Sequence, residues 1–405
     1  MQLGWIDFSK SERNKVLNVL DMLSEAGTLD ELGIAPIRDG FANLFFPGTS
    51  TIQTRAKYFL CVPYAFKEIE RSGETNPKRM FNALNAIEKS CGEHYISIDP
   101  KADGIIGRRA LSAGSWVKRA PSDVYWAGLR RLGIFVGGEL SIAEYIRFMC
   151  ANNSQKGTLK NLGNRNDTAE ENECDDNDAG KSLYKRFWNI PTYTRDWQDS
   201  LTLQLTSAES TFLKDQIIKN CEGSMFSYIL KNNLSHITEL NGFDELEHGF
   251  IEQFPESIQE DFTLARSFSD FVYVMRVLFN IIVSDSQNTD ANDEWKLIEP
   301  QLEELSKIDI DYVFERLALV GNAGLRHFLK QAQEHMRNRD VEALKECIIK
   351  REVHLKGVNR AKTKHPGEFD TTVWFGGGRL DYRFNNAKVI IKDIFEGVNN
   401  HAESE

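Results

Sequence analysis

Residues 257–283 read SIQEDFTLARSFSDFVYVMRVLFNIIV and place apolar side chains three or four positions apart along most of their length. Because this spacing lines one face of an α-helix, the stretch predicts a long amphipathic helix. Six further stretches in the second half of the chain show the same spacing: 207–220, 226–233, 295–305, 309–320, 325–338 and 341–354. Each apolar face needs a partner to pack against, so the sequence predicts a helical bundle or a stacked helical array.

The first 151 residues show a more mixed pattern. Start signals such as the capping box Ser9-x-x-Glu12 and the prolines Pro77 and Pro121 predict helices at 9–23, 49–60, 77–90 and 121–132. A basic helix beside a short β-hairpin would resemble a winged helix-turn-helix module. The expected fold class is therefore mainly α with minor β (α+β): a small, winged-helix-like N-terminal part and a larger helical C-terminal part.

An acidic stretch rich in Asn and Gly, at 152–180, separates the two parts. Between Asp167 and Asp178 it holds seven acidic residues, and such a stretch cannot bury enough apolar area to offset the entropy cost of ordering it. We therefore expect an N-terminal domain at 1–151, a flexible acidic linker at 152–180, and a helical domain at 181–405. The last domain is expected to end in a glycine-rich turn at Gly376–Gly378 and a final helix at 387–397.

The chain has 405 residues, with 49 Lys and Arg against 60 Asp and Glu, and a formal net charge of −11. Such a charge repels phosphate backbones and anionic lipid, so any nucleic-acid contact requires a local basic surface. The most apolar run, 271–283, contains Arg276 and is much shorter than the ~20 apolar residues that a membrane helix needs. The chain starts without a signal-peptide stretch, and its six cysteines include no C-x-x-C pair. We expect a cytoplasmic protein without membrane contact, bound metal or cofactor.

Several short motifs are similar to those of a known family. They are GWID at 4–7, FFPGTST at 45–51, TRA-x-YF at 54–59, Pro63, and LDYR at 380–383. Together they resemble an uncharacterised bacterial and archaeal family that is classed as a domain of unknown function, and the resemblance extends over both parts of the chain. It implies no reaction, cofactor or catalytic residue. It does imply a product of restriction-like or antiviral gene clusters, which also encode helicases and nucleases, and so favours work on nucleic acid.

Cations gather in the segment from Asp99 to Arg131, which has seven of them against three carboxylates. Aromatic residues lie between them, and this combination is typical of a helix that lies against phosphates. The predicted nucleic-acid-binding residues are Arg108, Arg109, Lys118, Arg119, Arg130 and Arg131. The alternative is that the aromatic residues belong to the core and that the arginines form a solvated face or pair with the acidic linker. A second basic stretch, 345–364, suits a phosphate, a partner's acidic surface, or simply solvent.

Thr49, Ser50 and Thr51, together with Arg55, form a second candidate site, for an anion. Hydroxyls and backbone amides at a helix N-terminus attract anions, although the Walker pattern G-x-x-x-x-G-K-[ST] is absent. The structural alternative is that these hydroxyls only cap the helix at 49–60, with Lys57 on its polar side. Arg55 would then form a buried ion pair, with Asp7 or Glu68 as the partner.

The chain shows no established catalytic pattern. Its eight histidines include neither H-E-x-x-H nor a pair at i, i+4, and His327 and His335 are expected on a polar surface. These absences and the local basic charge favour a non-catalytic accessory or adaptor protein of a bacterial antiviral or restriction-like system, contacting nucleic acid or a partner protein such as a helicase or nuclease. Two alternatives stay open: a hydrolase or nuclease with an unrecognised site near Arg55 and Asp381, and a pure protein–protein scaffold.

Overall fold

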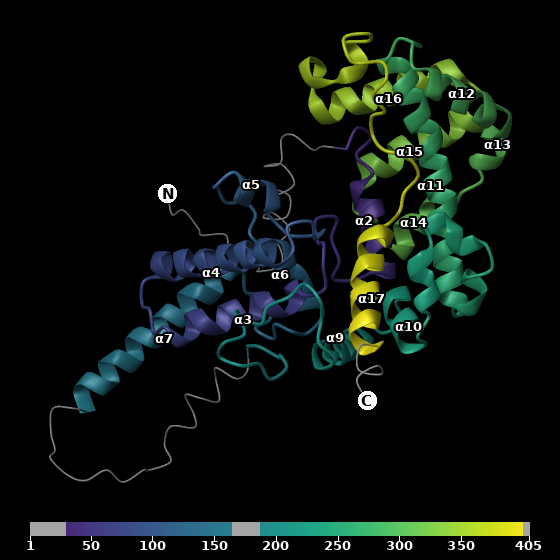
Figure 1. Ribbon diagram of the computed structural model, residues 1–405. Helices are drawn as coiled ribbons and strands as arrows, with labels where there is room; N and C mark the ends of the chain where they lie inside the picture. The colour runs from purple at the N-terminus through teal and green to yellow at the C-terminus, as the bar shows by residue number, and fades with distance from the viewer. Residues whose placement is uncertain (1–29, 164–186, 400–405) are drawn as a thin grey trace, which may run out of the picture. The chain divides into compact units, whose positions relative to one another are not determined.

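The computed structural model describes residues 30–163 and 187–399 (Figure 1). Within these ranges the backbone forms helices joined by turns, and the pairing of extended residues is limited to an isolated bridge between Phe135 and Trp188. The minor β content predicted from the sequence is therefore wrong: the described chain is all-α, without a sheet or a winged-helix hairpin. After α5 (Arg108–Ser112) the chain folds back on the helix, with Ser115 N donating to Ala110 O at 2.9 Å. This closed turn leaves no extended strand beside the basic segment.

Contacts between residues divide the chain into two compact units, each made of two stretches. The α11 unit, named after α11 (Glu256–Val283), consists of Met1–Phe41 and Asp261–Leu380. The α3 unit, named after α3 (Tyr58–Arg71), consists of Ala42–Glu260 and Asp381–Glu405. This division differs from the one predicted at 152–180, which stays a prediction because most of that stretch lies outside the described residues. Its first part, up to Gly163, is helical.

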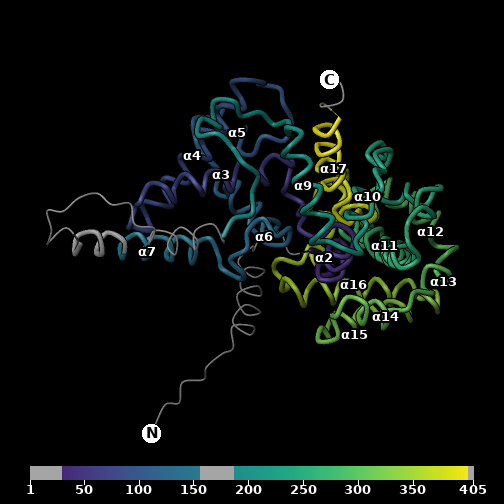
Figure 2. The backbone as a smooth tube through the Cα atoms, turned by 90° about the horizontal axis from the view of Figure 1, so that it is seen from below, coloured from purple at the N-terminus to yellow at the C-terminus, as the bar shows by residue number. Residues whose placement is uncertain are grey.

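The α3 unit is built around its namesake helix, in which every residue from Tyr58 to Phe66 is buried. A helix that is apolar on all sides belongs in a core, and here ring contacts such as Phe59 with Tyr125 surround it. The other helices of the unit are α4 (Pro77–Ile98), α5, α6 (Pro121–Arg131), α7 (Ile142–Gly163), α9 (Ser207–Asn220), α10 (Met225–Lys231), η1 (Ser235–Glu239), η2 (Phe243–Glu247), η3 (Ile251–Gln253) and α17 (Phe384–Asn399). α17 comes last in the chain, yet it packs directly beside α9 (Figure 2).

The α11 unit contains the apolar run from which the helical fold was predicted. α11 is confirmed as one long helix, and all residues from Phe271 to Ile281 are buried. The unit also holds α2 (Ala35–Phe45, up to Phe41), α12 (Thr289–Ile298), η4 (Glu299–Gln301), α13 (Leu302–Leu305), α14 (Ile310–Arg316), α15 (Ala323–Arg337), α16 (Val341–Lys356), η5 (Val358–Arg360) and η6 (Lys362–Lys364). The stretch predicted as one helix at 295–305 is divided, because Pro300 lacks the N–H that would continue α12.

α15 and α16 form a helical hairpin with a short connection. A side-chain carboxamide or carboxylate starts each helix: Asn322 Oδ1 accepts from Leu325 N, and Asp340 Oδ1 accepts from Ala343 N at 3.0 Å. These caps satisfy backbone N–H groups that have no partner within the helix. The helices predicted at 325–338 and 341–354 are thus confirmed.

The helix predicted to start among Thr49, Ser50 and Thr51 is wrong. These residues lie in turns, and α3 begins only at Tyr58. The Thr49 hydroxyl donates to Phe46 O at 2.6 Å, so it bonds within its own turn instead of capping a following helix. At Gly376–Gly378, where a glycine-rich turn was predicted, the backbone bends, with positive φ at the first two glycines.

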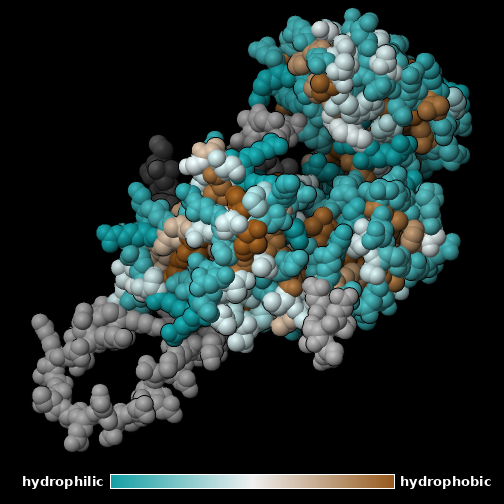
Figure 3. Space-filling view, viewed as in Figure 1, coloured by the Kyte–Doolittle hydropathy of each residue, from teal (hydrophilic) through white to brown (hydrophobic). Residues whose placement is uncertain are grey.

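Hydrophilic residues cover much of the face shown in Figure 3, with apolar residues between them. Among the described residues, exposed large apolar side chains occur in different parts of the chain, for example Ile98 of α4 and Leu297 of α12. Single exposed apolar residues of this kind are normal on a protein surface. Over the ranges that the structure describes, no helix combines the length and the apolar character needed to cross a membrane.

Candidate functional site

The structure brings together two segments that the sequence marked separately, 43–55 and 380–383. Arg383 Nη1 donates to Asn43 Oδ1 at 2.9 Å and to Thr49 O at 2.8 Å. The ring of Tyr382 lies against that of Phe45, with centroids 6.0 Å apart. Both Tyr382 and Arg383 adopt left-handed φ angles, which non-glycine residues hold only when surrounding contacts require it. The two segments therefore form one structural joint at the start of α17.

The Thr49–Thr51 turn is closed by its own neighbours. Gln53 bridges it, since its Oε1 accepts from Ser50 N at 3.1 Å and its Nε2 donates to Gly48 O at 3.1 Å. The helix that was expected to start at these hydroxyls begins only at Tyr58, so its N-terminus does not supply the anion site predicted here.

Arg55 forms a close ion pair with Asp393 of α17. Its Nε lies 2.9 Å from Oδ2 and its Nη2 lies 2.8 Å from Oδ1, while Ala56 N also donates to Oδ2 at 2.8 Å. The Asp393 side chain is only 5% exposed and that of Arg55 is 19% exposed. Burial raises the pKa of Asp393, and contact with the guanidinium opposes this rise. The predicted buried ion pair is present with a different partner: Glu68 pairs with Arg71, and Asp7 lies outside the described residues.

A hollow of about 520 Å³ opens beside this ion pair. Its charged lining is mixed, with Arg55 and Lys392 against Asp103, Asp393 and Glu396, so it holds no excess positive charge for an anion. Asp381 is not part of the lining. It lies just before α17, where its Oδ1 accepts from Arg383 N at 3.2 Å, whereas Asp393 lies more than two helical turns further along. Arg55 and Asp381 therefore share no site, which removes the geometric basis of the predicted hydrolase centre.

Lys57, expected on a polar face, is buried and pairs with Glu209. Its Nζ lies 2.7 Å and 2.8 Å from the two carboxylate oxygens. Glu209 also closes the capping box of α9, because its carboxylate accepts from Thr206 N at 2.9 Å. This pair ties the start of α3 to the start of α9 and leaves Lys57 without a free charge for a ligand.

The six predicted nucleic-acid-binding residues do not lie on one helix face. Arg130 and Arg131 end α6, and Lys118 and Arg119 precede it, so about 16 Å of helix separates the two pairs. Arg130 pairs with Glu139, and Arg131 donates to Asn220 O. These two side chains serve local structure at the C-terminal end of α6.

The remaining cations lie around α5. Arg108 Nη1 donates to Ala102 O at 3.0 Å and thereby fastens the loop before the helix. Arg109, Lys118 and Arg119 are exposed. A Cβ atom added to Gly107 would lie 2.9 Å from Val117 Cγ1, so the start of α5 and the residues before Lys118 are in contact. The structure therefore brings part of the predicted set together.

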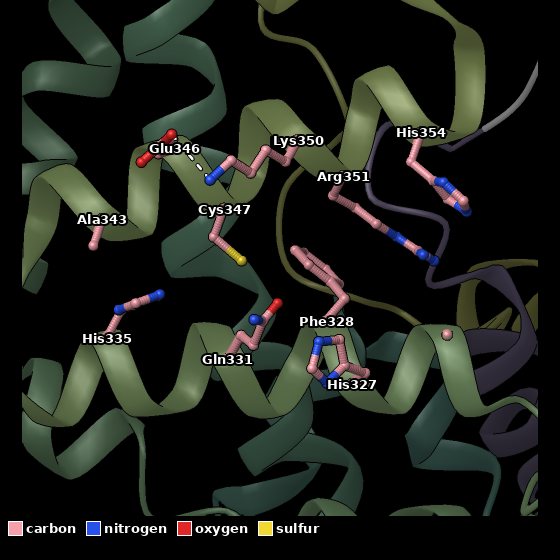
Figure 4. A pocket seen from close by; sticks show the side chains of 11 residues that line it. His327, Phe328, Gln331, His335, Ala343, Glu346, Cys347, Lys350, Arg351 and His354 are labelled. Carbon is pink, nitrogen blue, oxygen red and sulfur yellow. Dashed lines mark ion pairs between the residues drawn. The ribbon is translucent and has the colours of Figure 1, made fainter.

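A groove between α15 and α16 was not predicted; Figure 4 shows it from close by. It has a volume of about 430 Å³, and side chains of both helices point into the space between them. Its lining consists of Gly324, His327, Phe328, Gln331, His335, Ala343, Glu346, Cys347, Lys350, Arg351 and His354. His327 and His335, expected on a polar surface, share this groove with five residues of the basic stretch 345–364. The lining residues recur every three or four positions along each helix. This spacing could have indicated the groove, but only once the two helices are known to pack against each other.

Arg351 is partly structural. Its Nε donates to Leu32 O at 2.9 Å, and its guanidinium lies over the Phe328 ring, 5.1 Å from the centroid. Burial lowers the pKa of Arg351. Lys350 is exposed, and its Nζ lies 2.9 Å from Glu346 Oε1. Glu346 is the only carboxylate among the lining residues. In the described ranges, no cluster of three or more His, Cys, Asp or Glu is arranged to hold a metal ion.

Comparison with known proteins places the first part of the chain only. Residues 1–149 match a family of unknown function, DUF6361. The match ends well before α17, so it covers the 43–55 segment and not the LDYR segment. No curated protein matches the chain, and no solved structure matches it.

Proposed function

We propose that the protein is a cytoplasmic, non-catalytic accessory protein that contacts the phosphate backbone of a nucleic acid through the exposed cations around α5. The proposal rests on the exposure of Arg109 and Lys118 and on their lack of a carboxylate partner. Both are exposed, and within the described ranges no carboxylate pairs with either. Lysine and arginine side chains that no protein carboxylate neutralises are the groups that release counterions from a nucleic acid.

Local charge supports this surface. The segment from Asp99 to Arg119 has five Lys and Arg against two Asp, in a chain of net charge −11. The chain's excess of negative charge therefore lies outside this segment, which repels a phosphate backbone less than the chain as a whole does. The resemblance to a family from restriction-like or antiviral gene clusters supports a nucleic-acid system with a helicase or nuclease as partner protein.

The test is binding of the full chain to labelled single- and double-stranded DNA and RNA over a series of salt concentrations. The double variant Arg109→Ala, Lys118→Ala should weaken binding and lower the slope of log K against log salt by about 2. Arg108 and Arg131 are left unchanged, because they bond backbone carbonyls and their loss would also disturb the fold.

The matched control is Lys219→Ala, Lys231→Ala, which removes the same charge from exposed positions of α9 and α10 in the same unit. It should leave the slope unchanged. Equal effects of the two double variants would mean that binding depends on the net charge alone and not on the position of the cations. Absence of binding at low salt would refute the proposal and favour a pure protein–protein scaffold.

A further inference from the structure

The groove between α15 and α16 has the pattern of a helix-binding seam. On α15 the lining positions advance by four, three and four residues from Gly324 to His335, and on α16 the same steps run from Ala343 to His354. Steps of three and four keep side chains on one stripe of a helix, as in the a and d positions of helical bundles. Each stripe spans three turns, or about 16 Å. The two stripes line the same groove, so a third helix lying along the hairpin would meet both of them.

The floor and the rim of the groove differ in character. Phe328 and Cys347 are buried and form an apolar floor, whereas His327, Lys350 and His354 are exposed. Such a pairing of apolar floor and polar rim suits an amphipathic helix, whose narrow apolar stripe enters the groove. A small inorganic anion would use only the rim and would leave the floor unfilled.

The positive charge of the α15–α16 hairpin favours a partner helix with acidic residues over one with basic residues. Residues 323–356 have eight Lys and Arg against five Asp and Glu, and Asp311 and Glu31 from outside this range pair with Arg326, Lys330 and Lys356. The hairpin therefore keeps a small excess of positive charge, in contrast to the chain's net charge of −11. Within the groove, Lys350 and Arg351 face a single carboxylate, and three imidazoles add further hydrogen-bond donors. Carboxylates that flank the apolar stripe of an incoming helix would find complementary charge here.

We propose that the α15–α16 groove binds an acidic amphipathic helix of a partner protein. This inference goes beyond the proposed phosphate contact and does not depend on it, because the groove and the α5 cations belong to different units. The partner helix places apolar residues in steps of three and four against Phe328 and Cys347, and its acidic residues pair with Lys350 and the histidines at the rim.

The test uses a labelled synthetic peptide of about 18 residues, long enough to exceed three helical turns, with leucines in steps of four and three and glutamates at the flanking positions. Binding to the full chain is followed by fluorescence anisotropy at about 0.15 M salt, where weak long-range attraction is screened. A second peptide carries lysine in place of every glutamate. The acidic peptide should bind in the micromolar range and gain helical circular dichroism, and the basic peptide should not bind.

Two pairs of variants locate the site. Lys350→Glu should weaken binding of the acidic peptide about tenfold, whereas Arg337→Glu, the same charge change on an exposed residue of α15 outside the groove, should change it less than about twofold. Gln331→Trp places a large side chain in the middle of the groove and should abolish binding, whereas Glu334→Trp on the same helix should not. Lys350→Gln, which avoids a second negative charge next to Glu346, is the variant to use if Lys350→Glu loses thermal stability.

The outcomes separate the proposal from its rivals. Equal binding of the acidic and basic peptides, or equal affinity in all variants, would overturn it. Displacement of the acidic peptide by inorganic phosphate at constant ionic strength would also overturn it, in favour of a small-anion site. Loss of peptide binding in Lys350→Glu with unchanged nucleic-acid binding would support the groove independently of the α5 surface.

Discussion

The ion pair between Arg55 and Asp393 should be a major local contribution to the stability of the α3 unit. The variant Asp393→Asn keeps the shape of the side chain and removes its charge. In the native protein the carboxylate accepts from Arg55 Nε, Arg55 Nη2 and Ala56 N, and it is almost fully buried. The substitution therefore leaves a partly buried guanidinium without its counter-charge and weakens the bond that holds the backbone at Ala56.

The expected loss of stability follows from the burial of the ion pair. Removing one partner of a buried ion pair costs about 3 to 5 kcal/mol. The lower end of that range applies here, since the guanidinium also donates to Asp103 O and borders a hollow where water can reach it. We expect a loss of about 3 kcal/mol in the free energy of unfolding, or about 6 to 12 °C in melting temperature for a unit of this size. Replacing both partners by apolar residues, Arg55→Met with Asp393→Leu, should cost less than the two single changes together.

Calorimetry and tryptophan fluorescence during urea unfolding measure these differences on the full chain. The control is Glu68→Gln, which breaks the exposed pair with Arg71 and should change stability by less than about 1 kcal/mol. A loss below about 1 kcal/mol in Asp393→Asn, with no coupling in the double variant, would refute the structural role of the pair. Such a result would also mean that Arg55 is available to bind a ligand.

Two further predictions concern the interior of the same unit. Burial raises the pKa of Glu88 to about 8, against 4.5 for the ordinary group, so the folded protein keeps a proton that the unfolded chain releases. Stability should therefore fall as pH rises from about 4.5 to 8, by on the order of 5 kcal/mol, and Glu88→Gln should remove this dependence in urea unfolding at several pH values. Gly128→Ala would place a Cβ atom 2.5 Å from a backbone carbonyl oxygen and should destabilise the protein by at least about 2 kcal/mol, whereas Gly321→Ala, with open space around it, should change stability by less than about 1 kcal/mol. Thermal melting of the two alanine variants compares them directly, and similar melting temperatures would contradict the close packing at Gly128.

Much of the helical structure was predictable because its causes are local. The apolar spacing at 257–283 predicts α11, and the same spacing at 341–354 predicts α16. The expected β-hairpin and the helix at 49–60 failed for a related reason. Ser115 and Thr49 bond to carbonyls a few residues away, and such turns compete with longer elements without changing the apolar pattern.

The sequence by itself determined where most helices form. The hydrogen bonds of a helix join residues four positions apart, and apolar residues three or four positions apart give the helix the apolar face that it buries. Only the tertiary structure decided which charges are neutralised. Arg55 was a candidate for binding an anion until α17, 338 positions away, supplied Asp393. Lys57 was expected on a polar face until α9 supplied Glu209. The groove between α15 and α16 also exists only in the folded hairpin, because a site made by two elements depends on their contact in space and not on their order in the chain.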